Sequence, residues 1–117
     1  MRSPRSEWLF VKDMRESAGR VFDYTKGMEF EDFVASQITI DAVLRNFEII
    51  GEAAGRVSDE TRNLAPAIEW QRLKDFRNVV AHFYAGLEYE VVWKIIQTNL
   101  PPLMEQLLGL EPLLPRR

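Results

Sequence analysis

The sequence predicts an all-α protein that folds as a four- to five-helix up-down bundle. Apolar residues recur three and four positions apart in several segments, which is the period of a helix with one buried face. No stretch alternates polar and apolar residues over the length of a strand. The six glycines and six prolines fall mainly between the periodic segments, where they end helices. Up-down packing is the natural arrangement for helices that are joined by short connections.

The chain has 117 residues, of which 46% are hydrophobic, and this is long enough for a sizeable core. No internal repeat, low-complexity tract or long linker divides it. We therefore expect a single domain over 1–117, with its core over about 6–110 and a frayed tail over 111–117.

Each helix is predicted from its own local pattern. Ser6 is suited to cap the first helix and Gly27 to end it, and acidic residues favour the start of the second through the helix dipole. Ser58 begins a short turn or helix that stops before Pro66. The expected main helices cover residues 6–25, 28–34, 36–57, 68–83 and 88–99.

The helix over 36–57 has the strongest pattern in the chain. Its apolar face contains Ile40, Val43, Phe47, Ile50, Ala54 and Val57. A second, charged face contains Asp41, Arg45, Glu48, Glu52 and Arg56. Gly51 and Gly55 lie inside this helix, where each costs about 1 kcal/mol relative to alanine. We expect these small residues to permit the close approach of another helix.

The last two main helices end at glycine and proline signals. The apolar spacing of three, four and three recurs in the helix over 68–83, at Leu73, Phe76, Val80 and Phe83. Gly86 suits the left-handed position just beyond its end. The helix over 88–99 is expected to kink or break at Pro101 and Pro102, after which a helix resumes over 103–110.

Composition excludes several classes of function. Without cysteine the chain has no disulfide, thiolate metal site or cysteine nucleophile, and its single histidine disfavours a zinc site within one chain, so we expect no metal and no cofactor. No apolar run is long enough to span a membrane and the start lacks a secretion signal, so we expect a cytoplasmic protein. The net charge of −3 counts against a general nucleic-acid coating protein, and any RNA contact would be local.

The candidate site lies around the only histidine, His82. Histidine moves protons near neutral pH, and the guanidinium of Arg77 fits phosphate oxygens. Asn78 and Tyr84 add polar and aromatic groups. On a regular helix Asn78 and His82 share a face, whereas Arg77 and His82 lie about 140° apart. A groove that meets the helix edge-on could use both side chains, but the spacing does not require a shared site.

A purely structural interpretation stays open from the residues alone. His82 could satisfy the last carbonyls of its helix, and Tyr84 could be a half-buried aromatic. Arg77 could pair with Glu48 or Glu52 of the long helix. Glu48 could instead hold the Arg77 guanidinium in place for function. Glu52 could equally pair with Arg56 one turn away.

Residues 77–84 resemble the signature of the HEPN superfamily, with an arginine, four residues, a histidine, one residue and a tyrosine. The resemblance is to HepT-like toxins of prokaryotic toxin–antitoxin pairs. Residues 41–54 resemble the long second block of that family, and residues 91–93 with 99–101 resemble its closing helix. The similarity covers roughly residues 9–107 in the same order.

This resemblance implies a homodimer in which the two signatures face each other across a cleft. It also implies a nucleotidyltransferase antitoxin as partner, which in some systems transfers AMP to the tyrosine of the signature, here Tyr84. Metal-independent cleavage of an RNA substrate needs a base and an acid, and two copies would supply two histidines. In this hypothesis His82 is the general acid/base, Arg77 stabilises charge on phosphorus, and Asn78 and Tyr84 support them.

A different class of function is a non-catalytic helical dimer that binds a nucleotidyltransferase partner or a nucleotide. The acidic balance and the few flanking Lys and Arg residues favour this alternative. A plain structural bundle would explain the core but not the clustered signature.

Overall fold

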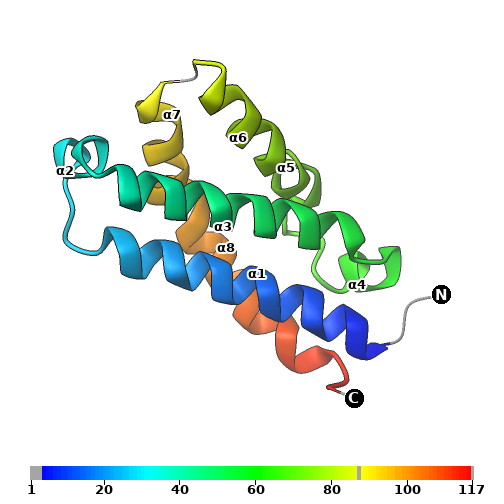
Figure 1. Cartoon of the computed structure of the whole chain (residues 1–117). Helices are drawn as coiled ribbons and strands as arrows, with labels where there is room; N and C mark the ends of the chain where they lie inside the picture. Colours follow the sequence, from blue (N-terminus) through cyan, green and yellow to red (C-terminus); the bar gives the residue numbers. More distant parts are fainter. Residues whose placement is uncertain (1–3, 87, 117) are drawn as a thin grey trace.

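Two long antiparallel helices, α1 (Pro4–Thr25) and α3 (Gln37–Arg56), lie side by side and form the frame of the fold (Figure 1). The structure is a computed structural model that describes residues 4–86 and 88–116. All regular elements within these residues are helical, so the predicted all-α class is confirmed.

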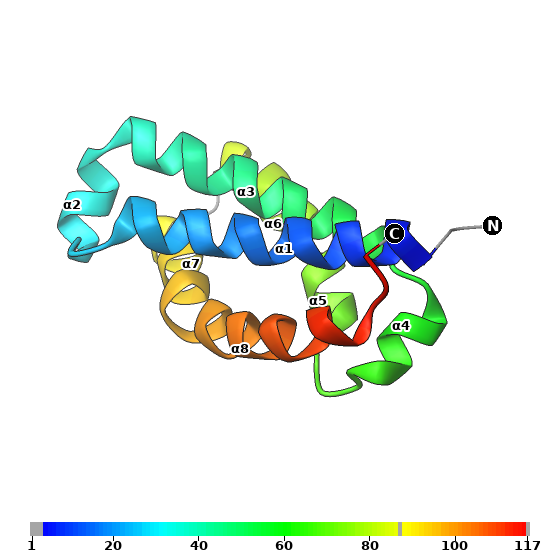
Figure 2. The ribbon, with the colours of Figure 1, turned by 90° about the horizontal axis from the view of Figure 1, so that it is seen from below.

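The other helices complete four columns that alternate in direction. The chain continues from α5 into α6, which packs on α3, and from α7 through a π-helix into α8, which runs along α1 (Figures 1 and 2). This is the up-down arrangement that the sequence predicted. The remaining elements are α2 (Phe30–Ala35), α4 (Asp59–Leu64), α5 (Trp70–Lys74), α6 (Phe76–Tyr84), α7 (Tyr89–Lys94), the π-helix η1 (Ile95–Asn99), α8 (Leu100–Leu110) and the 3₁₀-helix η2 (Glu111–Leu113).

Aromatic contacts join α6 to α3 of the frame and the short helices α2 and α7 to each other. The ring centroids of Phe47 on α3 and Phe76 on α6 lie 4.9 Å apart, and those of Phe33 on α2 and Trp93 on α7 lie 5.2 Å apart. Such pairs add to the free energy gained from burying their area. The apolar face predicted for α3 is buried at every position, namely Ile40, Val43, Phe47, Ile50, Ala54 and Val57.

Local signals set most helix ends. The Ser36 side chain accepts the Thr39 amide at 3.3 Å and caps α3, and Ser58 caps α4. Gly27 and Gly86 have φ of 76° and 113°, which are the left-handed conformations expected after α1 and α6. Ser6 was predicted to cap the first helix but does not, because α1 already begins at Pro4.

The helix predicted over 68–83 is interrupted at Asp75. The Asp75 carbonyl accepts the amides of both Asn78 (2.9 Å) and Val79 (3.0 Å), so the hydrogen-bond register changes between α5 and α6. The interruption lies directly before Phe76, whose ring packs on Phe47. Packing on α3 therefore overrides the helical continuity that the local pattern suggested.

Pro101 and Pro102 do not break the last helix, contrary to the prediction. They are the second and third residues of α8, and the helix continues through them. The turn before them is π-helical, and the Leu100 amide donates to the Ile95 carbonyl five residues back. The wider π turn makes room for the proline rings, so helix continues from α7 to α8.

The predicted fraying after residue 110 is also wrong for the described part of the tail. Glu111 and Leu114 are buried. The Glu111 carboxylate accepts two hydrogen bonds from the Arg15 guanidinium and one from the Trp8 indole at 3.3 Å. The hydrogen-bonded guanidinium holds the pKa of Glu111 below its ordinary value. This ion pair fixes the tail to α1.

We predict that Glu111→Gln lowers the free energy of unfolding by about 1.5–3 kcal/mol at neutral pH. Because the folded pKa is lowered, the carboxylate stabilises the fold above the unfolded pKa, and this contribution is lost as pH falls through the folded pKa. The difference between wild type and Glu111→Gln should therefore shrink below about pH 4 in urea unfolding. Glu105→Gln, at an exposed position of α8, is the control and should change little. If wild type and Glu111→Gln differed in unfolding free energy by the same amount at neutral pH and below pH 4, the ion pair of Glu111 with Arg15 would not be the source of the stability.

Candidate functional site

Helix α6 has one side against the bundle and one side bare. Phe76 and Val80 are buried, and Val79 and Phe83 are half-buried beside them. The helix is continuous from Phe76 to Tyr84, so the regular step of about 100° per residue applies.

The bare side contains all four residues that the sequence singled out on this helix. They span about 160° around the helix axis, with small side chains between them. The order around the axis is Tyr84, Arg77, Ala81, Ala85, Asn78 and His82, and each is exposed. This surface is called the α6 outer face below. The expected groups therefore share one continuous surface, whose centre is occupied only by the methyl groups of Ala81 and Ala85.

His82 does not cap its own helix. The Ala85 amide donates to the carbonyls of Ala81 (3.2 Å) and His82 (3.1 Å), and the Gly86 amide donates to Phe83 (3.0 Å). Within the described residues the imidazole makes no hydrogen bond. Tyr84 is 67% exposed rather than half-buried. The two structural roles that the sequence left open, His82 on the last carbonyls of its helix and Tyr84 as a half-buried ring, are therefore not seen.

The carboxylates of α3 pair within their own helix. Glu48 lies 4.0 Å from Arg45, and Glu52 lies 2.9 Å from Arg56. In the part of the chain that the structure describes, Arg77 forms no ion pair, so the expected contact between Glu48 and Arg77 is absent. These exposed pairs contribute only tenths of a kcal/mol, roughly, to stability.

The stem of Arg77 instead packs on Gly51. A β-carbon built on Gly51 would lie 2.8 Å from Arg77 Cγ, whereas one on Gly55 would meet nothing within 4 Å. The predicted close approach is therefore confirmed at Gly51 and wrong at Gly55, which is exposed. The sequence carried the signal, a glycine inside a helix, but did not distinguish the two positions.

Aromatic rings extend from the end of α6. The Phe83 ring meets Tyr84 edge-to-face at 5.9 Å and Tyr89 of α7 edge-to-face at 5.2 Å. The sequence analysis missed Tyr89, which lies five residues beyond the signature. Its contact with Phe83 depends on how α7 returns beside α6.

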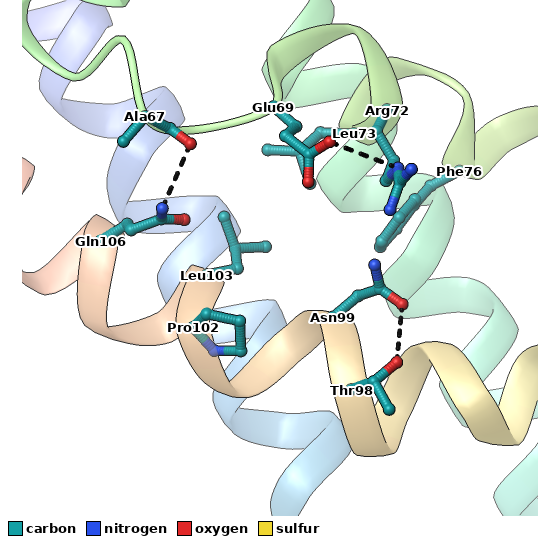
Figure 3. Close-up of a pocket in the computed structure, with 10 residues that line it drawn as sticks. All are labelled: Ala67, Glu69, Arg72, Leu73, Phe76, Thr98, Asn99, Pro102, Leu103 and Gln106. Atoms are coloured by element: carbon teal, nitrogen blue, oxygen red, sulfur yellow. Dashed lines mark hydrogen bonds and ion pairs between the residues drawn. The ribbon is translucent and has the colours of Figure 1, made fainter.

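The α6 outer face is open surface rather than a cleft of the single chain. Three cavities in the described residues are lined by residues elsewhere in the fold. One of about 140 Å³, between α5 and α8, has Leu73, Phe76 and Leu103 in its wall and Arg72 and Asn99 at its rim (Figure 3). None of the three is lined by a residue of the α6 outer face.

No three side chains of His, Asp or Glu come together within the described chain in a way that could hold a metal ion. Among the same residues, no helix is both long enough and apolar enough to cross a membrane.

The sequence model of the family described as "Ribonuclease HepT-like" matches residues 14–109, which include the whole of α6. The chain belongs to the HepT-like family. The family match begins inside α1 and ends just before the last residue of α8, so the tail that carries Glu111 lies outside it.

HepT-like relatives match most of this chain. A protein of Methanocaldococcus jannaschii named "Putative RNase" is 32% identical over 104 residues, which are 89% of this chain and 95% of that protein. A "Probable ribonuclease HepT" of Thermococcus cleftensis is 32% identical over 99 residues, 85% of this chain and 90% of that protein. No solved structure matches the chain.

Proposed function

We propose that this HepT-like chain is a metal-independent endoribonuclease that works as a homodimer. The observation that carries the proposal is the exposure of Arg77, Asn78, His82 and Tyr84 together on the α6 outer face. Within the described residues the imidazole of His82 and the guanidinium of Arg77 have neither a hydrogen bond nor an ion pair, so both polar groups are available to a ligand. The names of the relatives support the same activity.

A second copy of the chain would supply the cleft and the second histidine that a single chain lacks. The α6 outer face is not a cleft, and the chain has one histidine where RNA cleavage needs both a base and an acid. Two α6 outer faces related by a two-fold axis would place His82 and Arg77 of both copies around one groove. The methyl side chains of Ala81 and Ala85 would let the two helices approach closely.

Cleavage would proceed by attack of the ribose 2′-oxygen on the adjacent phosphorus. One His82 accepts the 2′-hydroxyl proton as the bond from the 2′-oxygen to phosphorus forms. The other His82 donates a proton to the 5′-oxygen as its bond to phosphorus breaks, which leaves a 2′,3′-cyclic phosphate and a 5′-hydroxyl. The Arg77 guanidinium stabilises the negative charge that builds up on the phosphoryl oxygens.

The neighbouring polar and aromatic groups would bind the substrate. Asn78 lies one turn before His82 and would orient the imidazole or donate to a phosphate oxygen. Tyr84 would stack on a base or contact phosphate, since unpaired RNA bases stack on aromatic rings. Glu48 is adjacent on α3, and a supporting role for it would require it to leave Arg45 when RNA binds.

We further propose that the chain is the toxin of a toxin–antitoxin pair with a nucleotidyltransferase antitoxin. The Tyr84 hydroxyl would attack the α-phosphorus of ATP, forming the phenolic O–P bond as pyrophosphate leaves and the phenolic proton is lost. The 67% exposure of Tyr84 leaves it accessible to such an enzyme. An anion beside Arg77 and His82 would fill the phosphate site and repel RNA.

We predict that His82→Ala lowers the rate of RNA cleavage by about 10²–10⁴-fold, as expected for loss of a general acid/base. The melting temperature should stay within about 2 °C, because an exposed substitution without partners changes stability little. The assay follows a labelled single-stranded RNA with EDTA present, and identifies the cyclic phosphate end. Undiminished cleavage by His82→Ala would refute the mechanism, and a wild type that binds its partner but never cuts RNA would favour the non-catalytic binding module.

We predict that co-expression with the nucleotidyltransferase partner adds the mass of AMP to the peptide that contains Tyr84. The modified protein should lose RNA cleavage, because the added phosphate occupies the anion site. Tyr84→Phe removes the attacking oxygen but keeps the ring, so it should stay unmodified and be insensitive to the partner's transferase activity. Modification of Tyr89 instead of Tyr84 would contradict the assignment.

A further inference from the structure

We propose that Gly51 on α3 is a positioning residue for Arg77. The aliphatic part of the Arg77 side chain packs directly on the Cα of Gly51. Any larger residue at position 51 would displace the guanidinium from the α6 outer face. The contact itself is independent of activity, whereas its effect on RNA binding rests on the ribonuclease function proposed above.

The backbone does not require glycine at this position. Gly51 is buried inside α3, and among the described residues only Gly27 and Gly86 have positive φ. Glycine in a helix interior is less stable than alanine because it loses more backbone freedom on folding. The helix therefore carries a cost at Gly51, and a steric requirement of its surroundings explains why it is kept.

The surroundings supply that requirement at three atoms. A β-carbon on Gly51 would lie 2.8 Å from Arg77 Cγ, and 3.2 Å from both the Arg77 amide nitrogen and the Leu73 carbonyl oxygen. The first contact is with a side chain that could rotate away. The other two are with backbone atoms on either side of the interruption at Asp75. Alanine at position 51 must therefore move the Arg77 side chain, the start of α6, or both.

Packing is the main restraint that the described structure places on Arg77. Its guanidinium forms no ion pair with any described residue, and the nearby carboxylates of Glu48 and Glu52 face arginines of their own helix. The direction of the side chain is therefore set at its stem, by Gly51 beneath Cγ. The contact between the tilted rings of Phe47 and Phe76 holds the two helices at this separation.

Gly55 provides a matched control on the same helix. It lies one turn beyond Gly51, is exposed, and has open space where a β-carbon would be. Gly55→Ala makes the same chemical change in α3 without touching Arg77. It should raise helix stability slightly and leave the α6 outer face unchanged.

The first test measures RNA affinity with chains that cannot cut. In a His82→Ala background, a labelled single-stranded RNA is titrated and its fluorescence anisotropy recorded. Gly51→Ala should weaken binding about tenfold, the lower end of the effect of losing one charged hydrogen bond to phosphate, and Gly55→Ala should stay within about twofold. Binding by Gly51→Ala as tight as by its parent would overturn the proposal.

A double-mutant comparison shows whether Gly51 acts through Arg77. Arg77→Ala removes the Cγ atom and should itself weaken RNA binding. Adding Gly51→Ala to Arg77→Ala should then cost less than about twofold more, because no guanidinium remains to be displaced. An equal loss with and without Arg77 would assign the effect to general disruption and overturn the positioning role.

Melting temperature gives a readout that needs neither RNA binding nor catalysis. Arg77→Ala relieves the 2.8 Å contact, so it should raise the melting temperature of Gly51→Ala while leaving that of the Gly51 chain little changed. The same comparison applies if Gly51→Ala alone fails to fold. If Arg77→Ala changed the melting temperature equally in the Gly51 chain and in Gly51→Ala, the proposal would be overturned. If the wild type neither binds nor cuts RNA, the proposed function fails, and this comparison still decides whether Gly51 positions Arg77.

Discussion

The packing of α6 on α3 is the interaction on which the candidate site depends. The Phe76 ring packs on the Phe47 ring with centroids 4.9 Å apart, and Gly51 allows the backbone at the start of α6 to lie directly against α3. These contacts use the apolar side of a nine-residue helix and fix its rotation about its own axis. The opposite side, with Arg77 and His82, must then face outward. A rotation of half a turn would bury both residues.

The electrostatics of the α6 outer face suit a local phosphate site on an acidic protein. The chain carries a net charge of −3, and Glu48 and Glu52 lie on α3 before and after Gly51, on which Arg77 packs. Because Glu48 and Glu52 pair with arginines along α3, the Arg77 guanidinium remains without an anion in the described chain. Two copies brought together at this face would double the positive charge there while the rest of the surface stays acidic.

Sequence patterns predicted the features that depend on neighbouring residues along the chain. They failed for features that are determined by contacts between residues far apart in the sequence. The long apolar repeat of α3 follows from helical spacing alone. The interruption at Asp75 accompanies the packing of Phe76 on Phe47 of α3, and the ordered tail depends on Glu111 meeting Arg15, 96 positions away. The pattern within each helix does not show which distant residue it will contact. The sequence left open whether Glu48 pairs with Arg77, and in the structure Glu48 pairs with Arg45 of its own helix.

Disulfide trapping shows whether two copies meet through the α6 outer face. The chain has no cysteine, so Ala81→Cys and Ala85→Cys each introduce a single thiol at the centre of this face. A disulfide forms only when the two Cα atoms lie within about 7 Å. The account predicts that at least one of them becomes a covalent dimer under mild oxidation, whereas Ala35→Cys, exposed on α2, stays monomeric. Monomers from both α6 variants under the same conditions would contradict it.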